Sequence, residues 1–183
     1  MPGNLANFDA WLADPGNIPF AHWSSSIVRP IGPPNPQLMI LSDFPEDSDC
    51  AQGQLFSGEQ GALLDSMLVA IGLNRADQRC ASIAFTRPPT QRLSGEEGAQ
   101  QLIDIAHHHI ALVRPKILLL LGQQACQIIL SEKMMPAPEH QPIINHIHPK
   151  TDAFAAHHPR TLIVQPQLKR HAWEVLKRVR ELI

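Results

Sequence analysis

Short apolar runs alternate along this chain with longer segments in which apolar residues recur at helical spacing. Residues 37–41 (QLMIL) form a short apolar run bounded by turn residues, which predicts a buried central strand. From Gly58 the apolar residues recur every three or four positions as far as Gly72, where a glycine cap would end a helix. The regular structure therefore begins with a strand, a loop and a helix.

The same order is repeated further along the chain. Residues 80–85 (CASIAF) are weakly strand-like, and Ser94 with Glu97 three positions later forms a capping box that predicts the start of another helix. Residues 117–121 (ILLLL) are the most hydrophobic predicted strand, and Gly122 opens a short helix. Alternating strands and helices predict a parallel sheet with both faces covered.

The C-terminal third is predicted from weaker signals. Residues 131–160 contain five prolines and five histidines and are predicted to be loop-like. Residues 161–164 (TLIV) are typical of a last strand, and residues 167–183 of a closing amphipathic helix. These four strands predict an α/β protein, a three-layer α/β/α sandwich around a mainly parallel four-stranded sheet.

The first 36 residues differ in character from the rest. They end in the proline-rich stretch IGPPNP, where missing amide donors and a fixed φ exclude regular structure. We expect residues 1–36 to form an arm that packs on a domain formed by residues 37–183.

Composition narrows the class of protein. The chain has 183 residues, 44% of them hydrophobic, which suits one domain with a substantial core. Its formal charge of −2 gives no general attraction to a polyanion, so contact with nucleic acid would need a local basic patch. Three widely spaced cysteines argue against a disulfide framework and fit a reducing compartment. No run approaches the length of a membrane helix, so we expect a cytoplasmic protein.

In an open parallel sheet, ligands bind beside the loops that follow the carboxyl ends of the strands. Three loop segments at such positions, together with the helix that lies between the first two, resemble the uracil-DNA glycosylase superfamily, especially the bacterial branch whose members often carry an iron–sulfur cluster. The resemblance spans residues 37–180. It is carried by residues 42–46 (SDFPE) with 52–58 (QGQLFSG), 63–75 (LLDSMLVAIGLNR), 87–92 (RPPTQR) and 165–173 (QPQLKRHAW).

The resemblance implies a role for five residues. It implies hydrolysis of the N-glycosidic bond of uracil, or of a related deaminated base, in base-excision DNA repair. Such an enzyme takes the base out of the stack and holds it in a pocket. The family's catalytic carboxylate falls on Asp43, its stacking aromatic on Phe56 and its reader of the base edge on Ser82. Arg87 and Arg92 would face DNA phosphates.

The chain departs from the family motifs at several of these positions. Asp43 is one methylene shorter than the usual Glu, and Ser82 replaces an Asn that offers both a donor and an acceptor. Ser42 and Glu46 replace glycines, and Glu46 adds negative charge beside the expected phosphate path. The resemblance thus leaves open a non-catalytic member of the fold that binds DNA, a nucleotide or a protein partner.

Two residues are candidates for the hydrogen-bond donor that would stabilise the departing base. Counting back from Trp173 places His158 on the family histidine and makes residues 152–156 (DAFAA) the last strand. Periodicity instead makes residues 161–164 the strand and puts Gln165 in the loop. An imidazole can donate as a neutral or charged group, whereas an amide is a weaker donor, which favours His158.

The expected partner is DNA, single- or double-stranded and containing a deaminated base, and we expect a monomer. We expect no metal and no organic cofactor. We also expect no iron–sulfur cluster, because the family cluster needs four cysteines, including a pair ahead of the first strand, and residues 1–49 contain none. A further alternative is an unrelated hydrolase that holds a metal in the histidine-rich segment. The consecutive histidines 107–109 would fan around a helix, which makes a zinc site there a weak hypothesis.

Overall fold

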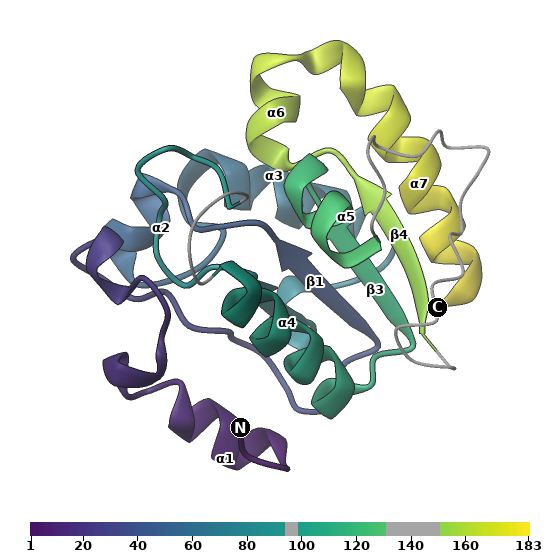
Figure 1. The fold of residues 1–183 in the computed structure, drawn as a ribbon. Helices are drawn as coiled ribbons and strands as arrows, with labels where there is room; N and C mark the ends of the chain where they lie inside the picture. Colours follow the sequence, from purple (N-terminus) through teal and green to yellow (C-terminus); the bar gives the residue numbers. More distant parts are fainter. Residues whose placement is uncertain (94–98, 131–150) are drawn as a thin grey trace.

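The computed structural model describes residues 1–93, 99–130 and 151–183 (Figure 1). At its centre is a four-stranded sheet in which every pairing is parallel and the strand order is β2-β1-β3-β4. The strands are β1 (Leu38–Ser42), β2 (Arg79–Ser82), β3 (Ile117–Leu121) and β4 (Asp152–Ala156). The predicted α/β class is confirmed.

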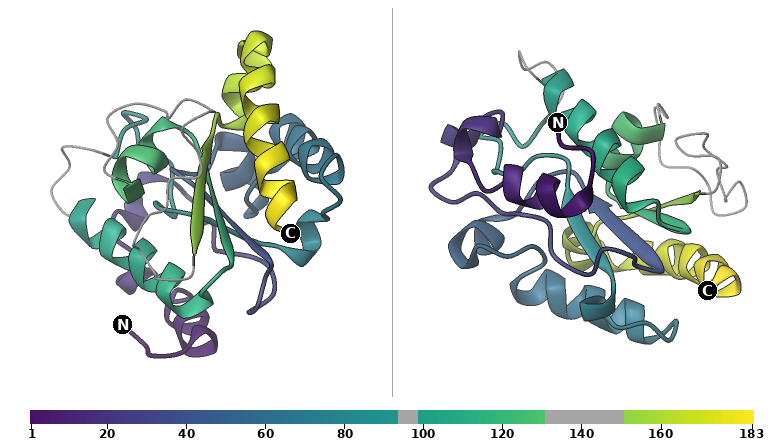
Figure 2. Two further views of the ribbon diagram at one scale, coloured as in Figure 1. Left: turned by 90° about the vertical axis from the view of Figure 1, so that its right-hand side faces the viewer. Right: turned by 90° about the horizontal axis from the view of Figure 1, so that it is seen from below.

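Helices cover both faces of this sheet, as the two views in Figure 2 show. Helices α1, α4 and α5 pack on one face, and α3 and α7 pack on the other. Every residue of β1 and β3 is buried, which explains their uninterrupted apolar sequences. The described helices are α1 (Leu5–Trp11), α2 (Asp47–Gln52), α3 (Gly58–Val69), α4 (Ala99–Val113), α5 (Gln123–Leu130), α6 (Pro159–Val164) and α7 (Lys169–Leu182), with 3-10 turns at Pro15–Asn17, Ala21–Trp23, Arg75–Asp77 and Pro166–Leu168.

Most of the predicted elements are present, with ends shifted by a few residues. The capping box predicted at Ser94 and Glu97 lies outside the described residues. No helix in the described part of the chain is long and apolar enough to cross a membrane.

The last strand lies earlier in the chain than the hydrophobic periodicity predicts. Residues 152–156 form β4, and Ala156 pairs in register with Leu121 of β3. Residues 161–164 belong to α6, whose start is capped because His158 Nδ1 accepts the backbone N–H of Arg160. Pro159 in the first turn favours the helix further. The prediction of a strand at residues 161–164 after a loop is therefore wrong.

The strand order creates a switch point between β1 and β3. After β1 the chain leaves through α3 on one face of the sheet, whereas after β3 it leaves through α5 on the other. The loops that follow these neighbouring strands therefore diverge at the carboxyl edge. This is where open α/β sheets bind their ligands.

A buried arginine ties the N-terminal segment to the sheet. Arg79 in β2 is 3% exposed and donates to the Asp9 carboxylate of α1, to the Gly32 carbonyl (3.0 Å) and to His109 Nε2 (3.2 Å). Burial, together with Arg79, lowers the pKa of His109 to about 3, so this imidazole is a neutral acceptor. Phe8 of α1 packs against the same imidazole, with 5.1 Å between ring centroids.

We expect Arg79→Met to lower the free energy of unfolding by about 2 kcal/mol, because the buried His109 and two more exposed acceptors, Asp9 and the Gly32 carbonyl, lose a charged donor. Urea unfolding followed by circular dichroism measures this change. Arg180→Met is the matched control: Arg180 is exposed in the last turn of α7, and we expect a change within about 0.5 kcal/mol. Equal stability of the two variants would contradict the anchoring role.

Candidate active site

Asp43 lies at the switch point, directly after β1. Its carboxylate is 1% exposed and has protein donors on both oxygens. The backbone N–H of Phe44 donates to Oδ1 (2.9 Å), and the guanidinium of Arg160 donates to Oδ2 (2.5 Å). Burial raises the pKa of Asp43, while Arg160 opposes that rise. Burial acts to lower the pKa of Arg160, but pairing with Asp43 and Glu46 outweighs it and leaves that pKa raised.

Gly122 allows Asp43 to approach the end of β4. This glycine follows β3 and has a φ of +105°, a conformation that favours glycine. A Cβ placed there would lie 3.3 Å from Asp43 Oδ2 and 3.6 Å from His158 Cβ. Asp43 and His158 therefore both lie within 4 Å of the space that a side chain at Gly122 would occupy.

His158 follows β4 and is 2% exposed. Burial, and to a smaller extent the charge of Arg160, hold its pKa well below the ordinary value, so the ring is neutral at pH 7. Because Nδ1 accepts the Arg160 N–H (3.2 Å), we assign the single ring proton to Nε2. The site thus contains a neutral imidazole with a fixed tautomer, whose Nε2–H is the group left to donate.

Phe56 packs beside this imidazole, with 5.9 Å and 29° between the two rings. Its φ of +56° is unusual for a residue with a side chain, and its surroundings maintain it. Arg75 donates to the Phe56 carbonyl (2.5 Å) and is itself paired with Asp65 (2.8 Å). A Cβ on Gly61 would lie 1.7 Å from that carbonyl, so only glycine lets α3 pass there. The backbone that carries the aromatic ring is therefore held in one conformation.

Ser82 ends β2 and is 4% exposed. Its hydroxyl donates to the Ala84 carbonyl (2.6 Å), so only its lone pairs remain for a ligand. Ser42, its partner in register on β1, is also buried, and its hydroxyl has no hydrogen-bond partner among the described residues.

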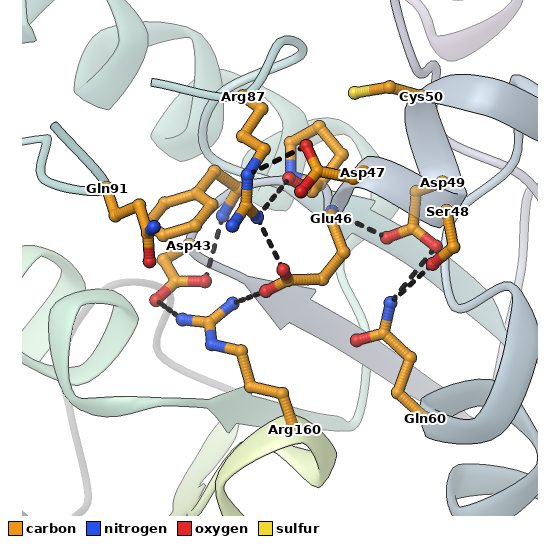
Figure 3. Close-up of polar contacts among 12 residues, drawn as sticks. Asp43, Glu46, Asp47, Ser48, Asp49, Cys50, Gln60, Arg87, Gln91 and Arg160 are labelled. Carbon is orange, nitrogen blue, oxygen red and sulfur yellow. Dashed lines mark hydrogen bonds and ion pairs between the residues drawn. The ribbon is translucent and has the colours of Figure 1, made fainter. Parts of the chain in front are cut away.

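Two arginines converge near Asp43, as Figure 3 shows. Arg160, in the first turn of α6, bonds both Asp43 and Glu46. Arg87, on the loop after β2, pairs with the carboxylates of Glu46 and Asp47. The resemblance predicts a phosphate-facing role for Arg87 and none for Arg160. Arg160 comes directly after His158 and Pro159. The register counted back from Trp173 therefore places it just past the end of the last strand, which is the signal that could have found it.

The two remaining predicted residues lie on the surface. Arg92 is exposed on the loop that carries Arg87. Gln165 is exposed at the C-terminal end of α6, so a whole helix separates it from His158. The residues that the structure brings together are therefore Asp43, Phe56 and His158. Their predicted roles stay predictions.

The sequence profile described as the Uracil DNA glycosylase superfamily matches residues 29–180, most of the chain. The chain belongs to this superfamily. It is similar to the Type-4 uracil-DNA glycosylase of Archaeoglobus fulgidus, with 24% identity over 164 residues that cover 86% of this chain and 82% of the relative. The protein of the same name from Sulfurisphaera tokodaii is 24% identical over 158 residues, which cover 82% of this chain and 72% of that relative.

The four-cysteine cluster of some uracil-DNA glycosylase superfamily members does not fit the residues of this chain. The chain has three cysteines, Cys50, Cys80 and Cys126, and all three are buried. Cys126 packs on one face of the sheet and the other two on the opposite face, so they do not share a site. Outside residues 94–98 and 131–150, no three His, Cys, Asp or Glu side chains gather as metal ligands. Residues 131–150, where the hypothesis of a metal-dependent hydrolase places most of its ligands, lie outside the described residues.

Proposed function

We propose that this protein acts in DNA repair by hydrolysing the N-glycosidic bond of uracil, or of a related deaminated base, in DNA. The observation that supports this most directly is the meeting of Asp43, Phe56 and His158 at the switch point. A buried carboxylate, a fixed aromatic ring and a neutral N–H donor are the groups that base excision needs. The similarity to proteins named Type-4 uracil-DNA glycosylase supports the same reaction.

In the proposed reaction the flipped base stacks on Phe56. The bond between the base nitrogen and the sugar C1′ breaks, and its electron pair leaves with the base. His158 Nε2–H donates to the oxygen of the departing base, where negative charge develops. Asp43 stabilises the positive charge on the sugar and orients a water molecule. The water oxygen bonds to C1′, and its proton finally reaches the base.

The state of Ser82 bears on which base is accepted. Its hydroxyl proton is committed to Ala84, so Ser82 can accept hydrogen bonds from a base but offers no donor of its own. An Asn side chain would offer both. We infer that the base edge is read less strictly than an Asn would read it, so that hypoxanthine and xanthine join uracil as candidate substrates.

The contact between Arg160 and Asp43 favours a second candidate function. Both oxygens of the Asp43 carboxylate carry protein donors, so in this state neither is fully free for water or sugar. A non-catalytic protein that binds DNA would tolerate this arrangement. Its DNA affinity would survive Asp43→Ala, and no abasic product would form.

We expect purified protein to form abasic sites in labelled single- or double-stranded oligonucleotides that carry uracil, hypoxanthine or xanthine, and Phe56→Ala to lower that rate about tenfold. The reason is the loss of a stacking face worth about 1–3 kcal/mol per base. Alkali cleavage followed by gel separation measures the product. Phe20→Ala is the control, because Phe20 stacks on Trp23 in the N-terminal segment instead. No product at high protein concentration on any of the three bases would contradict the proposed activity and favour the binding function.

A further inference from the structure

The side chain of Glu46 lies between two guanidinium groups (Figure 3). Arg160 donates to Oε1 (2.7 Å), and Arg87 bonds Oε2. All three side chains are partly exposed, at 18% for Glu46, 28% for Arg160 and 17% for Arg87. One carboxylate therefore fills the space between two cations at the edge of the candidate active site.

The two guanidiniums have a second support besides Glu46. The ring of the largely buried Phe44 lies under both, with its centroid 4.7 Å from the central carbon of Arg160 and 5.7 Å from that of Arg87. Arg87 also contacts the Pro45 carbonyl (3.5 Å). The pair is thus positioned by groups that would remain if the Glu46 carboxylate withdrew.

A carboxylate and a phosphate bind guanidinium groups in the same planar, bidentate manner. We propose that Arg87 and Arg160 form a binding site for a backbone phosphate of the substrate, and that Glu46 occupies this site until the phosphate displaces it. The proposal rests on the proposed function in one respect, namely that the phosphate belongs to a nucleotide strand. A hollow of about 440 Å³ lined by Trp23, Cys50 and Arg87, among others, gives that strand room beside the site.

Displacement of Glu46 also changes the state of Asp43. Arg160 bonds Asp43 Oδ2 and Glu46 Oε1 at the same time. A phosphate that draws Arg160 toward itself leaves Oδ2 free to face water or the sugar, while Phe44 N–H still holds Oδ1. Phosphate binding therefore prepares the carboxylate. A substrate without that phosphate leaves it paired.

The test is Glu46→Gln. This change keeps the shape of the side chain and the hydrogen bond that the backbone N–H of residue 46 donates to Asp49 (3.0 Å), but it removes the charge that competes with phosphate. The probes are deoxyuridine 3′,5′-bisphosphate and deoxyuridine by calorimetry, and a fluorescein-labelled uracil-containing single strand by anisotropy. We expect the bisphosphate and the strand to bind about tenfold more tightly, the free-energy scale of one charge-assisted hydrogen bond, and deoxyuridine binding to stay unchanged.

Two further variants show where any gain arises. Asp77→Asn makes the same change of charge at an exposed residue two positions before β2, at the opposite edge of the sheet, and we expect less than a twofold effect. Adding Arg87→Met to Glu46→Gln should remove most of the gain. Glu46→Ser, which places a favoured residue at the N-cap of α2, removes the same charge, and we expect it too to bind the bisphosphate and the strand more tightly; it replaces Glu46→Gln in the test if that variant folds poorly.

The outcomes separate this proposal from the proposed function. Tighter binding by Glu46→Gln without any excision supports the phosphate site and contradicts the glycosylase activity. Excision by the wild-type protein, with phosphate affinity unchanged in Glu46→Gln, supports the activity and overturns the phosphate site. An equal gain in Asp77→Asn overturns it too, because net charge alone then explains the effect.

Discussion

Replacing Asp43 with asparagine should lower the rate of base excision by about 10²–10⁴-fold, while the affinity for DNA falls little or rises. Asparagine matches the carboxylate in shape and can still accept the Phe44 N–H. It carries no negative charge to stabilise the sugar cation and is a far weaker acceptor for the attacking water. Single-turnover formation of abasic sites at saturating protein measures the chemical step apart from binding.

The matched control for this variant is Asp47→Asn. Asp47 lies four residues after Asp43, at the start of α2, but its side chain is 88% exposed and pairs with Arg87 at the surface. Loss of the Asp47 charge should change the single-turnover rate less than threefold, because exposed ion pairs contribute little. If the two variants lose activity equally, or if Asp43→Asn keeps full activity, Asp43 is not the catalytic carboxylate.

Replacing His158 with alanine should lower the single-turnover rate by about 10²–10³-fold, the usual cost of removing one preorganised donor to a developing anion. Gln165→Ala is the control, and its rate should stay within twofold of the wild type. The pH profile adds a second readout. Since burial holds the pKa of His158 well below its ordinary value, the ring is neutral at pH 6.5 and above, and the rate should not fall as pH rises from about 6.5 to 8.

The result for this pair of variants decides between the two alternatives that the sequence leaves open. A large loss in Gln165→Ala with little loss in His158→Ala would reverse the assignment. A rate that falls as pH rises through 6.5 would show that the charged imidazole is required, in conflict with the buried, neutral ring described above.

The sequence predicts the central strands well because burial on both faces leaves a plain apolar run, as in residues 117–121. The hydrophobic pattern fails at residues 152–156, which the register counted back from Trp173 places correctly in the last strand, and the failure has a physical reason. In DAFAA the residues are mostly alanine, which has low strand propensity, and the strand forms through pairing with β3 and packing of Phe154 against α7. TLIV has high strand propensity, yet the histidine cap and Pro159 make it helical. Tertiary contacts outweigh local propensity in both places.

The candidate site was predictable as far as the motifs reach. Asp43, Phe56 and His158 meet because each follows, or packs beside, the carboxyl end of a strand. The state of each group was not predictable. Motif spacing says nothing of the hydrogen bond that occupies Ser82, of the tautomer of His158, or of the arginine that covers Asp43. These depend on contacts between segments far apart in the chain.

The ion pair between Asp43 and Arg160 joins residues 117 positions apart. Asp43 and Phe56 are therefore synthesised well before His158 and Arg160. Native pairing of β1 with β3, and of β3 with β4, is therefore slow to form compared with the local helices. Until the C-terminal segment docks, the carboxylate lacks its cation and the imidazole its burial. A nascent chain that ends before β4 thus carries Asp43 and Phe56 in an unfinished sheet, without the two groups that complete the candidate site.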